Sequence, residues 1–148
     1  MTIGEFCNRE VVIATRETTI VEVAKLMRQY HVGDVVVVDS GGNENKPVGI
    51  ITDRDIVLKA VAGEVDHSSV IAGDVMSHEL LLGREQDGIW VTLQRMRSRG
   101  VRRLPVVNDR GGLEGIVTVD DLLELLSEEL LSLSRLVNRE MEREKERI

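Results

Sequence analysis

The chain of 148 residues has few aromatic side chains and a single cysteine. Its only aromatic residues are Phe6, Tyr30 and Trp90, too few to stack the successive bases of a nucleic-acid single strand. Cys7 has no second cysteine to pair with, so an intramolecular disulfide and a thiolate metal cluster are both excluded. No stretch approaches the roughly 18 consecutive apolar residues of a membrane-spanning helix.

The chain also lacks an excess of basic residues, since its formal net charge is −7 at pH 7. Proteins that bind the phosphate backbone of nucleic acid usually carry a basic surface, so nucleic acid is not the expected partner. The first residues do not follow the basic and then apolar layout of a signal peptide. We therefore expect a cytoplasmic protein with no membrane partner.

Catalytic motifs are absent as well. The chain contains no Gly-x-Ser-x-Gly, no Walker loop and no His-Glu-x-x-His. Its three histidines, His31, His67 and His78, fall in different predicted elements without the spacing of metal ligands. We predict that the protein is not an enzyme, has no catalytic residues, binds no metal and needs no obligatory cofactor.

What the chain does contain is a phrase that occurs twice. Gly-Ile-Ile-Thr-Asp-Arg-Asp-Ile at 49–56 returns as Gly-Ile-Val-Thr-Val-Asp-Asp-Leu at 115–122. Upstream, the segment 32–39 matches 101–108, with an offset three positions larger. This difference falls in a glycine-rich turn, where a duplicated fold tolerates insertions. The chain is therefore a tandem repeat.

Hydrophobic patterning predicts the order β-α-β-β-α in each copy, a mixed α/β fold. Short apolar runs predict strands at 11–14, 35–38 and 47–51, and again at 80–82, 104–107 and 113–118. The intervening segments have helical spacing. We place repeat 1 at 8–65, repeat 2 at 72–126 and a C-terminal helical extension at 127–148. Because a repeat of roughly 60 residues is marginally stable alone, we expect the two copies to pack against each other as a pseudo-twofold pair.

The second copy continues into a long C-terminal helix. Leu126, Leu130, Leu133 and Val137 follow one another at steps of four, three and four residues, the spacing of a helix-pairing stripe. An exposed apolar helix face favours a partner.

The repeated phrase combines groups that suit a nucleotide. Thr52 and Thr118 end a predicted strand just before a helix, where unpaired backbone N–H groups favour an anion. Asp55 and Asp121, in the first helical turn, can accept both hydroxyls of a ribose. The alternative is that the threonines only cap their helices and the aspartates lie in a favourable first turn.

This pattern resembles the cystathionine-β-synthase (CBS) domain, present as the tandem pair called a Bateman module. The resemblance covers roughly 8–126 and depends on the element order, the central strand at 101–107 and the Gly-h-h-Thr-x-x-Asp phrase, where h is apolar. It implies a regulatory module that binds AMP, ADP, ATP, NAD or S-adenosylmethionine in a cleft between the repeats. It also implies homodimerisation through helices.

The resemblance also implies roles for individual residues. Asp55 and Asp121 would hold ribose hydroxyls, and Thr52 and Thr118 would contact phosphate or ribose. The edges of the two first strands would receive adenine, and aliphatic side chains would cover its faces. These adenine-binding positions are Ala14, Thr15, Leu82 and Gly83 at the strand edges, with Val35, Val36, Leu104 and Pro105 over the faces.

The two copies differ in charge. Arg102 and Arg103 occupy the positions of Gly33 and Asp34 in the first copy. Because arginine binds phosphate and an acid repels it, we expect the stronger phosphate site in the second repeat, with Arg54 compensating in the first. The alternative is that Arg102 or Arg103 is simply solvated.

The leading hypothesis is thus a regulatory module that senses an adenine nucleotide or NAD and signals to an effector protein. The alternative hypothesis is a dimerisation or interaction scaffold whose clefts bind nothing.

Overall fold

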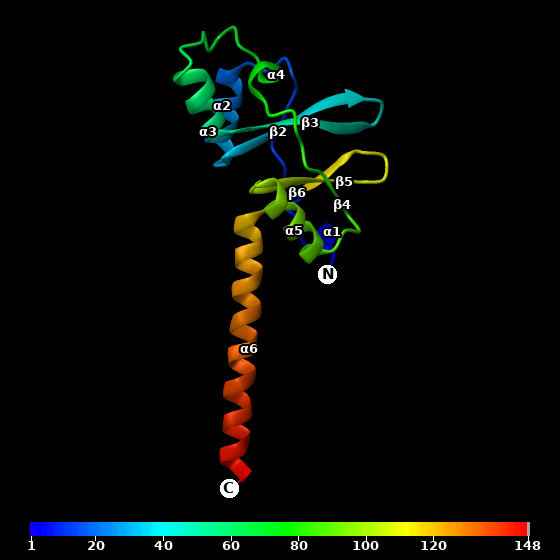
Figure 1. Cartoon of the computed structure of the whole chain (residues 1–148), viewed down its shortest axis with the longest axis vertical. Coiled ribbons are helices and arrows are strands. Elements are labelled where there is room, and N and C mark those ends of the chain that lie inside the picture. Colours follow the sequence, from blue (N-terminus) through cyan, green and yellow to red (C-terminus); the bar gives the residue numbers. More distant parts are fainter. Residues whose placement is uncertain (148) are drawn as a thin grey trace. The chain divides into compact units, whose positions relative to one another are not determined.

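The computed structural model describes residues 1–147 and divides into two units, Met1–Val117 and Thr118–Ile148 (Figure 1). The first unit contains two three-stranded sheets, in the order β1-β2-β3 and β4-β5-β6, with β6 ending at the boundary. The second unit is a single helix. The predicted mixed α/β class with two similar halves and a long C-terminal helix is confirmed.

The first repeat is built around β2, which lies in the middle of its sheet. β1 pairs with β2 in parallel and β3 pairs with it antiparallel. In chain order the elements are α1 (Ile3–Phe6), β1 (Ile13–Ala14), α2 (Ile20–Tyr30), β2 (Asp34–Gly41), β3 (Glu44–Thr52), α3 (Asp53–Asp55) and the π-helix η1 (Ile56–Val61). All four valines of β2, residues 35–38, are buried, as expected for a β-branched strand covered on both faces.

The second repeat retraces this order around β5. Its elements are α4 (Ala72–Val75), β4 (Gly83–Arg84), α5 (Ile89–Arg99), β5 (Arg103–Val107) and β6 (Leu113–Thr118), followed by α6 (Val119–Arg147). β4 pairs with β5 through Gly83 and Val106, the positions that correspond to Ala14 and Val37 in the first sheet. The first two strands therefore pair in the same register in both sheets.

The first strand of each sheet is shorter than the sequence predicts. We expected strands at 11–14 and 80–82, whereas pairing is limited to Ile13–Ala14 and Gly83–Arg84. In the second repeat the prediction was wrong in position, because the half-buried leucines 80–82 precede the paired residues. Gly83 is buried, and a Cβ there would press against the side chains of Ile3 and Leu104.

The short helices α1 and α4 each pack on the other repeat. In α1, the Ile3 amide donates to the Asp87 carbonyl of repeat 2 at 2.8 Å. In α4, the Ala72 amide donates to the Thr18 carbonyl of repeat 1 at 2.7 Å. The two bonds join equivalent positions of the two copies. The leading segment of each repeat, which starts with α1 or α4 and ends before β1 or β4, therefore packs on the other repeat, and the exchange is symmetric.

The exchange continues along the chain as two short backbone bridges. Asn8 pairs antiparallel with Ile116 of β6, and Ser77 pairs antiparallel with Ile50 of β3. Each leading segment thus lies against the last strand of the other repeat. The two repeats are joined by backbone hydrogen bonds as well as by side-chain packing.

A hydrophobic cluster joins the two sheets. Val36 and Val38 from β2 and Ile116 from β6 are buried together, with Val11, Ile50 and Leu113 partly buried around them. Burial of apolar surface is the dominant favourable term in such an interface. The expected packing of the two copies against each other is confirmed.

Polar contacts also connect the repeats at the turn ends of the sheets. Glu44 of β3 accepts hydrogen bonds from Arg110 Nε at 2.6 Å and Asn108 Nδ2 at 3.2 Å, both in the turn between β5 and β6. The guanidinium of Arg110, and then the amide of Asn108, hold the pKa of the Glu44 carboxyl below its ordinary value.

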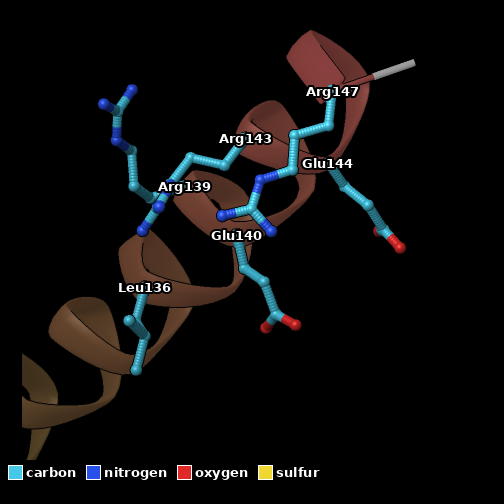
Figure 2. A pocket seen from close by; sticks show the side chains of 6 residues that line it. All are labelled: Leu136, Arg139, Glu140, Arg143, Glu144 and Arg147. Atoms are coloured by element: carbon cyan, nitrogen blue, oxygen red, sulfur yellow. The ribbon is translucent and has the colours of Figure 1, made fainter.

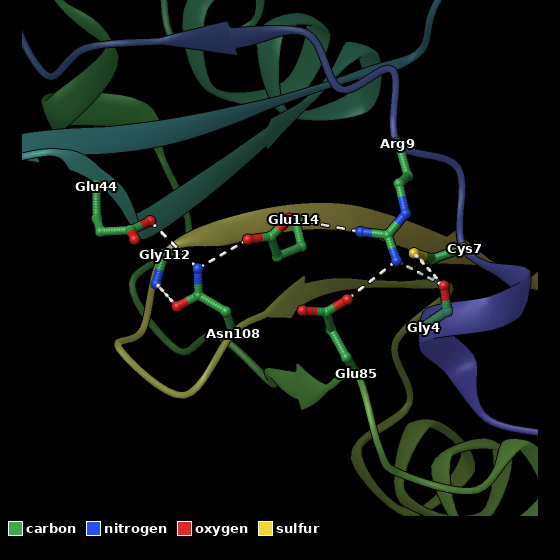
Figure 3. Close-up of polar contacts among 8 residues, drawn as sticks. All are labelled: Gly4, Cys7, Arg9, Glu44, Glu85, Asn108, Gly112 and Glu114. Atoms are coloured by element: carbon green, nitrogen blue, oxygen red, sulfur yellow. Dashed lines mark hydrogen bonds and ion pairs between the residues drawn. The ribbon is translucent and has the colours of Figure 1, made fainter.

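Arg9 extends this polar network along the leading segment (Figure 3). Its guanidinium lies 3.0 Å from Glu85 Oε2 and 3.4 Å from Glu114 Oε2, and it donates to the Gly4 carbonyl at 2.7 Å. The Asn108 amide donates to the other oxygen of Glu114 at 2.8 Å. These contacts hold the exchanged segment to the second repeat.

The helix of the second unit, α6, runs without interruption over 29 residues. It therefore contains both the last helix of repeat 2 and the predicted extension, with no break between them. Leu130, Leu133 and Val137, which belong to the predicted stripe, are exposed by 54–67%.

Candidate functional site

Thr52 and Asp55 are held together by a reciprocal capping box at the start of α3. The Asp55 amide donates to Thr52 Oγ1 at 3.1 Å, and the Thr52 amide donates to Asp55 Oδ2 at 2.9 Å. Thr52 therefore does cap its helix, as the capping interpretation expects, and whether it also contacts a ligand stays a prediction. The capping box leaves room for a ligand as well, because a carboxylate offers about four lone-pair sites and the cap uses only one of them, on Oδ2.

The π-helix η1 begins at the residue after Asp55. Within it, Lys59 Nζ lies 3.6 Å from Asp55 Oδ1 and donates to the Val75 carbonyl at 3.0 Å. Single π-turns inside helices are frequent at functional sites. Lys59 partly balances the charge of Asp55 and ties the helix to α4.

Thr52 and Asp55 face a pocket of about 280 Å³ whose lining comes from both repeats and lies entirely in the first unit. Such a volume is just below the roughly 300–1,000 Å³ range of small-molecule sites. The lining residues are Ile50, Thr52, Asp55, Ser77, Glu79, Leu80, Leu81, Gly100, Val101, Arg102, Arg103 and Pro105. A hydroxyl, carboxylates, guanidinium groups and aliphatic side chains thus converge on one pocket.

Arg102 and Arg103 therefore lie in the pocket of Thr52 and Asp55. Arg103 Nε lies 2.7 Å from Asp34 Oδ2, and Nε itself is buried without a well-directed hydrogen bond. The contact is thus an ion pair with poor hydrogen-bond direction. For Arg103 the solvated alternative is wrong, because its charge is balanced inside the protein.

A second pocket, of about 610 Å³, has corresponding residues in its lining. It too lies in the first unit. Asn8, Glu10, Val11, Val12 and Val32 are the first-copy equivalents of Ser77, Glu79, Leu80, Leu81 and Val101. Arg9, Ile13, Leu26 and Tyr30 complete the lining. The duplicated chain thus forms two related pockets that differ in side chains.

In the second copy of the phrase, the Asp121 amide donates to Thr118 Oγ1 at 3.2 Å. Thr118 therefore accepts at the start of α6 the same bond that Thr52 accepts at the start of α3. Both side chains are partly exposed. Their predicted roles toward a ligand stay predictions.

The other predicted residues are distributed unevenly. Pro105 lines the first pocket, whereas Ala14, Val35, Val36, Gly83 and Leu104 are buried in the core. The Thr15 amide bonds to Thr18 Oγ1, Leu82 is partly buried and Arg54 is exposed. None of these but Pro105 is among the residues that line the pockets described above.

Sequence reasoning missed the contribution of the leading segments. Ser77, Glu79, Leu80 and Leu81 line the first pocket, yet all four precede Leu82 and Gly83, the positions that we expected to receive adenine. The exchange of leading segments brings them beside Thr52 of the other repeat. Their signal in the sequence is weak: they repeat the 8–12 segment with only Glu10 and Glu79 identical.

A third hollow, of about 450 Å³, lies along the last turns of α6 (Figure 2). Its lining is Leu136 followed by alternating basic and acidic side chains on the later turns of this one helix. It is the space between long side chains of a single helix, so we assign it no ligand. Among residues 1–147, no three His, Cys, Asp or Glu side chains gather as metal ligands would.

Two segments of the chain, 3–61 and 72–128, each match the CBS domain family. The chain belongs to the CBS domain family. The two matched segments correspond to the two structural repeats, so the chain carries a CBS pair. In the described part of the chain, every helix is too short or too polar to span a bilayer.

Several proteins resemble this CBS pair. An uncharacterized protein of Methanopyrus kandleri is 38% identical over 84% of this chain and 62% of its own length, so the chain spans less than two thirds of that relative. The CBS domain-containing protein YhcV of Bacillus subtilis is 37% identical over 76% of each chain.

Among solved structures, the CBS domain pair of protein MJ0100, in complex with 5′-methylthioadenosine and S-adenosyl-L-methionine, is 25% identical with a TM-score of 0.74. The match covers 85% of this chain and 99% of that one.

Proposed function

We propose that the protein is a non-catalytic regulatory module that binds an adenosine-containing ligand and signals its bound state to an effector protein. The observation that carries this proposal is the pocket in which Thr52 and Asp55 of one repeat meet Arg102, Leu80 and Pro105 of the other. The carboxylate accepts ribose hydroxyls, and the aliphatic side chains cover the base. Because both repeats contribute, one ligand contacts both.

The chemistry of this pocket fits an adenosine derivative. Apart from its phosphates, such a ligand presents a diol and a flat base with apolar faces, which match a carboxylate beside aliphatic walls. The solved complex of the MJ0100 CBS pair with two adenosine derivatives supports this class. AMP, ADP, ATP and NAD are the further candidates.

Ligand binding would couple the two repeats energetically. A ligand that binds only the folded protein stabilises it by RT ln(1 + [L]/Kd), which is about 2.7 kcal/mol at a hundredfold excess over Kd. Transmission to an effector requires that the ligand bind two conformations with different affinity. Stabilisation by ligand is therefore the first property to measure.

Isothermal titration calorimetry tests the proposal. We expect adenosine, AMP, ATP, NAD or S-adenosylmethionine to release or absorb heat with ligand-free protein, and Asp55→Asn to weaken binding at least about tenfold by removing a charged acceptor. Asp121→Asn tests the second copy in the same way. The matched control is Asp74→Asn, which makes the same change at the start of α4, outside the pocket, where Asp74 accepts from the Ile71 amide. The absence of binding by all five compounds would contradict the proposal.

The scaffold alternative is favoured by one observation, the exposed stripe of α6. Leu130, Leu133 and Val137 each expose more than half of their surface, and they repeat with coiled-coil spacing. A second copy of the chain, forming a homodimer through this helix, would cover them. If no nucleotide shifts the thermal midpoint of the wild type or of Asp55→Asn while the protein self-associates, the scaffold is the better description.

A further inference from the structure

Asp34 and Arg103 occupy equivalent positions in the two repeats. They correspond to each other in the match between 32–39 and 101–108, and each begins its strand, β2 or β5. Residues at equivalent positions meet only near a pseudo-twofold axis. The two copies differ at this position, and the acid of the first copy contacts the base of the second directly.

The contact is largely shielded from water. The side chains of Arg103 and Asp34 are exposed by 26% and 18%, and the Arg103 Nε is 2.7 Å from the carboxylate oxygen. Partly buried charge pairs are screened by salt much less than exposed ones. Arg103 therefore presents little free positive charge to the pocket that it lines.

The other charges of the pocket are balanced too. Asp55 has Lys59 beside it at 3.6 Å. The remaining charged lining residues are Arg102 and Glu79, one of each sign. A pocket without net positive charge does not compensate the several negative charges of a polyphosphate.

We propose that Asp34 is a specificity-determining residue: by neutralising Arg103, it makes this pocket select a nucleoside whose 5′ substituent carries no net negative charge over a nucleoside polyphosphate. The proposal rests on the function proposed above and narrows its ligand class. The volume of the pocket, about 280 Å³, agrees with a ligand of nucleoside size.

The test compares adenosine, AMP and ATP by calorimetry in buffer without divalent cations. Wild-type protein is expected to bind adenosine at least as tightly as AMP and about tenfold more tightly than ATP. Asp34→Asn frees the Arg103 guanidinium for phosphate, so ATP affinity should rise about tenfold while adenosine affinity stays within about twofold. A role of Asp34 in folding alone would change all three affinities together.

Two further variants sharpen the test. Asp39→Asn makes the same charge change at the exposed end of β2, where Asp39 pairs with Arg16 at 2.9 Å, and should leave the ligand preference unchanged. The double variant Asp34→Asn with Arg103→Gln removes the pair as a unit and should keep the wild-type preference. If Asp34→Asn alone does not fold, the double variant still shows whether Arg103 contributes to the binding of ATP.

Three results would overturn the proposal while leaving the proposed function intact. They are tighter binding of ATP than of adenosine by the wild type, equal changes in all three affinities in Asp34→Asn, and loss of ATP binding in the double variant. If none of the three compounds binds to the wild type, the proposed function itself fails.

Discussion

At the scale of single residues, close packing explains the glycine that begins each copy of the doubled phrase. A Cβ at Gly115 would lie 2.5 Å from Cys7 Sγ and 2.9 Å from the Asn8 carbonyl oxygen. Asn8 cannot move away easily, because its backbone exchanges two hydrogen bonds with Ile116, of 3.0 and 2.9 Å. Gly49 packs in the same way against Met76 in the other half. The glycine is therefore required by the exchanged leading segment.

Gly115→Ala is expected to destabilise the protein by about 1–3 kcal/mol, the usual cost of overpacking a well-ordered site. Chemical denaturation followed by circular dichroism measures it. The matched control is Gly41→Ala, since a Cβ at Gly41 has no atom within 4 Å. Equal midpoints for the two variants would contradict this account.

At the scale of elements, the threonine and aspartate of the phrase act first on local structure. Thr52 and Thr118 each accept the amide of the aspartate three residues later, so both helices start where the phrase predicts. Capping and ligand binding are compatible, because the cap uses only part of each side chain. The long helix α6 then presents an apolar stripe that nothing in its own unit can cover.

Leu133→Gln is expected to weaken self-association at least about tenfold, because burying one leucine side chain contributes about 1.5–3 kcal/mol. Sedimentation equilibrium over a range of protein concentrations measures it. Leu131→Gln is the control: Leu131 is also exposed, by 52%, but lies outside the four–three spacing. A wild type that stays monomeric throughout, or a control with the same effect, would refute the homodimer through α6.

At the scale of the whole molecule, the two repeats of the first unit are joined by three kinds of contact. Backbone bonds exchange the leading segments, the cluster of Val36, Val38 and Ile116 buries apolar surface, and Glu44 bonds to Arg110 and Asn108. The last of these contacts depends on pH, because Arg110 lowers the pKa of Glu44 from its ordinary 4.5.

A carboxyl whose pKa is lower in the folded protein stabilises it above the unfolded pKa, and this stabilisation disappears as pH falls through the folded value. Glu44 should therefore contribute fully near neutral pH and progressively less below about pH 4.5. We expect Glu44→Gln to lower thermal stability at pH 7 and to converge with wild type in acid. Thermal melts from pH 7 to pH 3 measure this difference, with Glu129→Gln on α6 as the control. A constant difference at all pH values would contradict the assignment.

Much of the fold could be predicted because its signals are local. The β-branched run at 35–38, the helical spacing and the threonine before each last helix depend on neighbours only a few residues away. The strand at 80–82 was misplaced for the opposite reason. Its position is decided by how Gly83 fits between Ile3 and Leu104, which lie far from it in sequence or in another element.

The sequence by itself determined that the chain is a tandem repeat, that each copy has the order β-α-β-β-α, and that Thr52 and Asp55 stand together at a helix start. Only the tertiary structure decided which residues of the two copies meet. It placed the second repeat's leading segment beside Thr52, and it paired Asp34 with Arg103. The physical reason is that such contacts join segments of different repeats, far apart in the chain, across a pseudo-twofold axis. The periodicity of a single sequence does not indicate which of those segments contact each other.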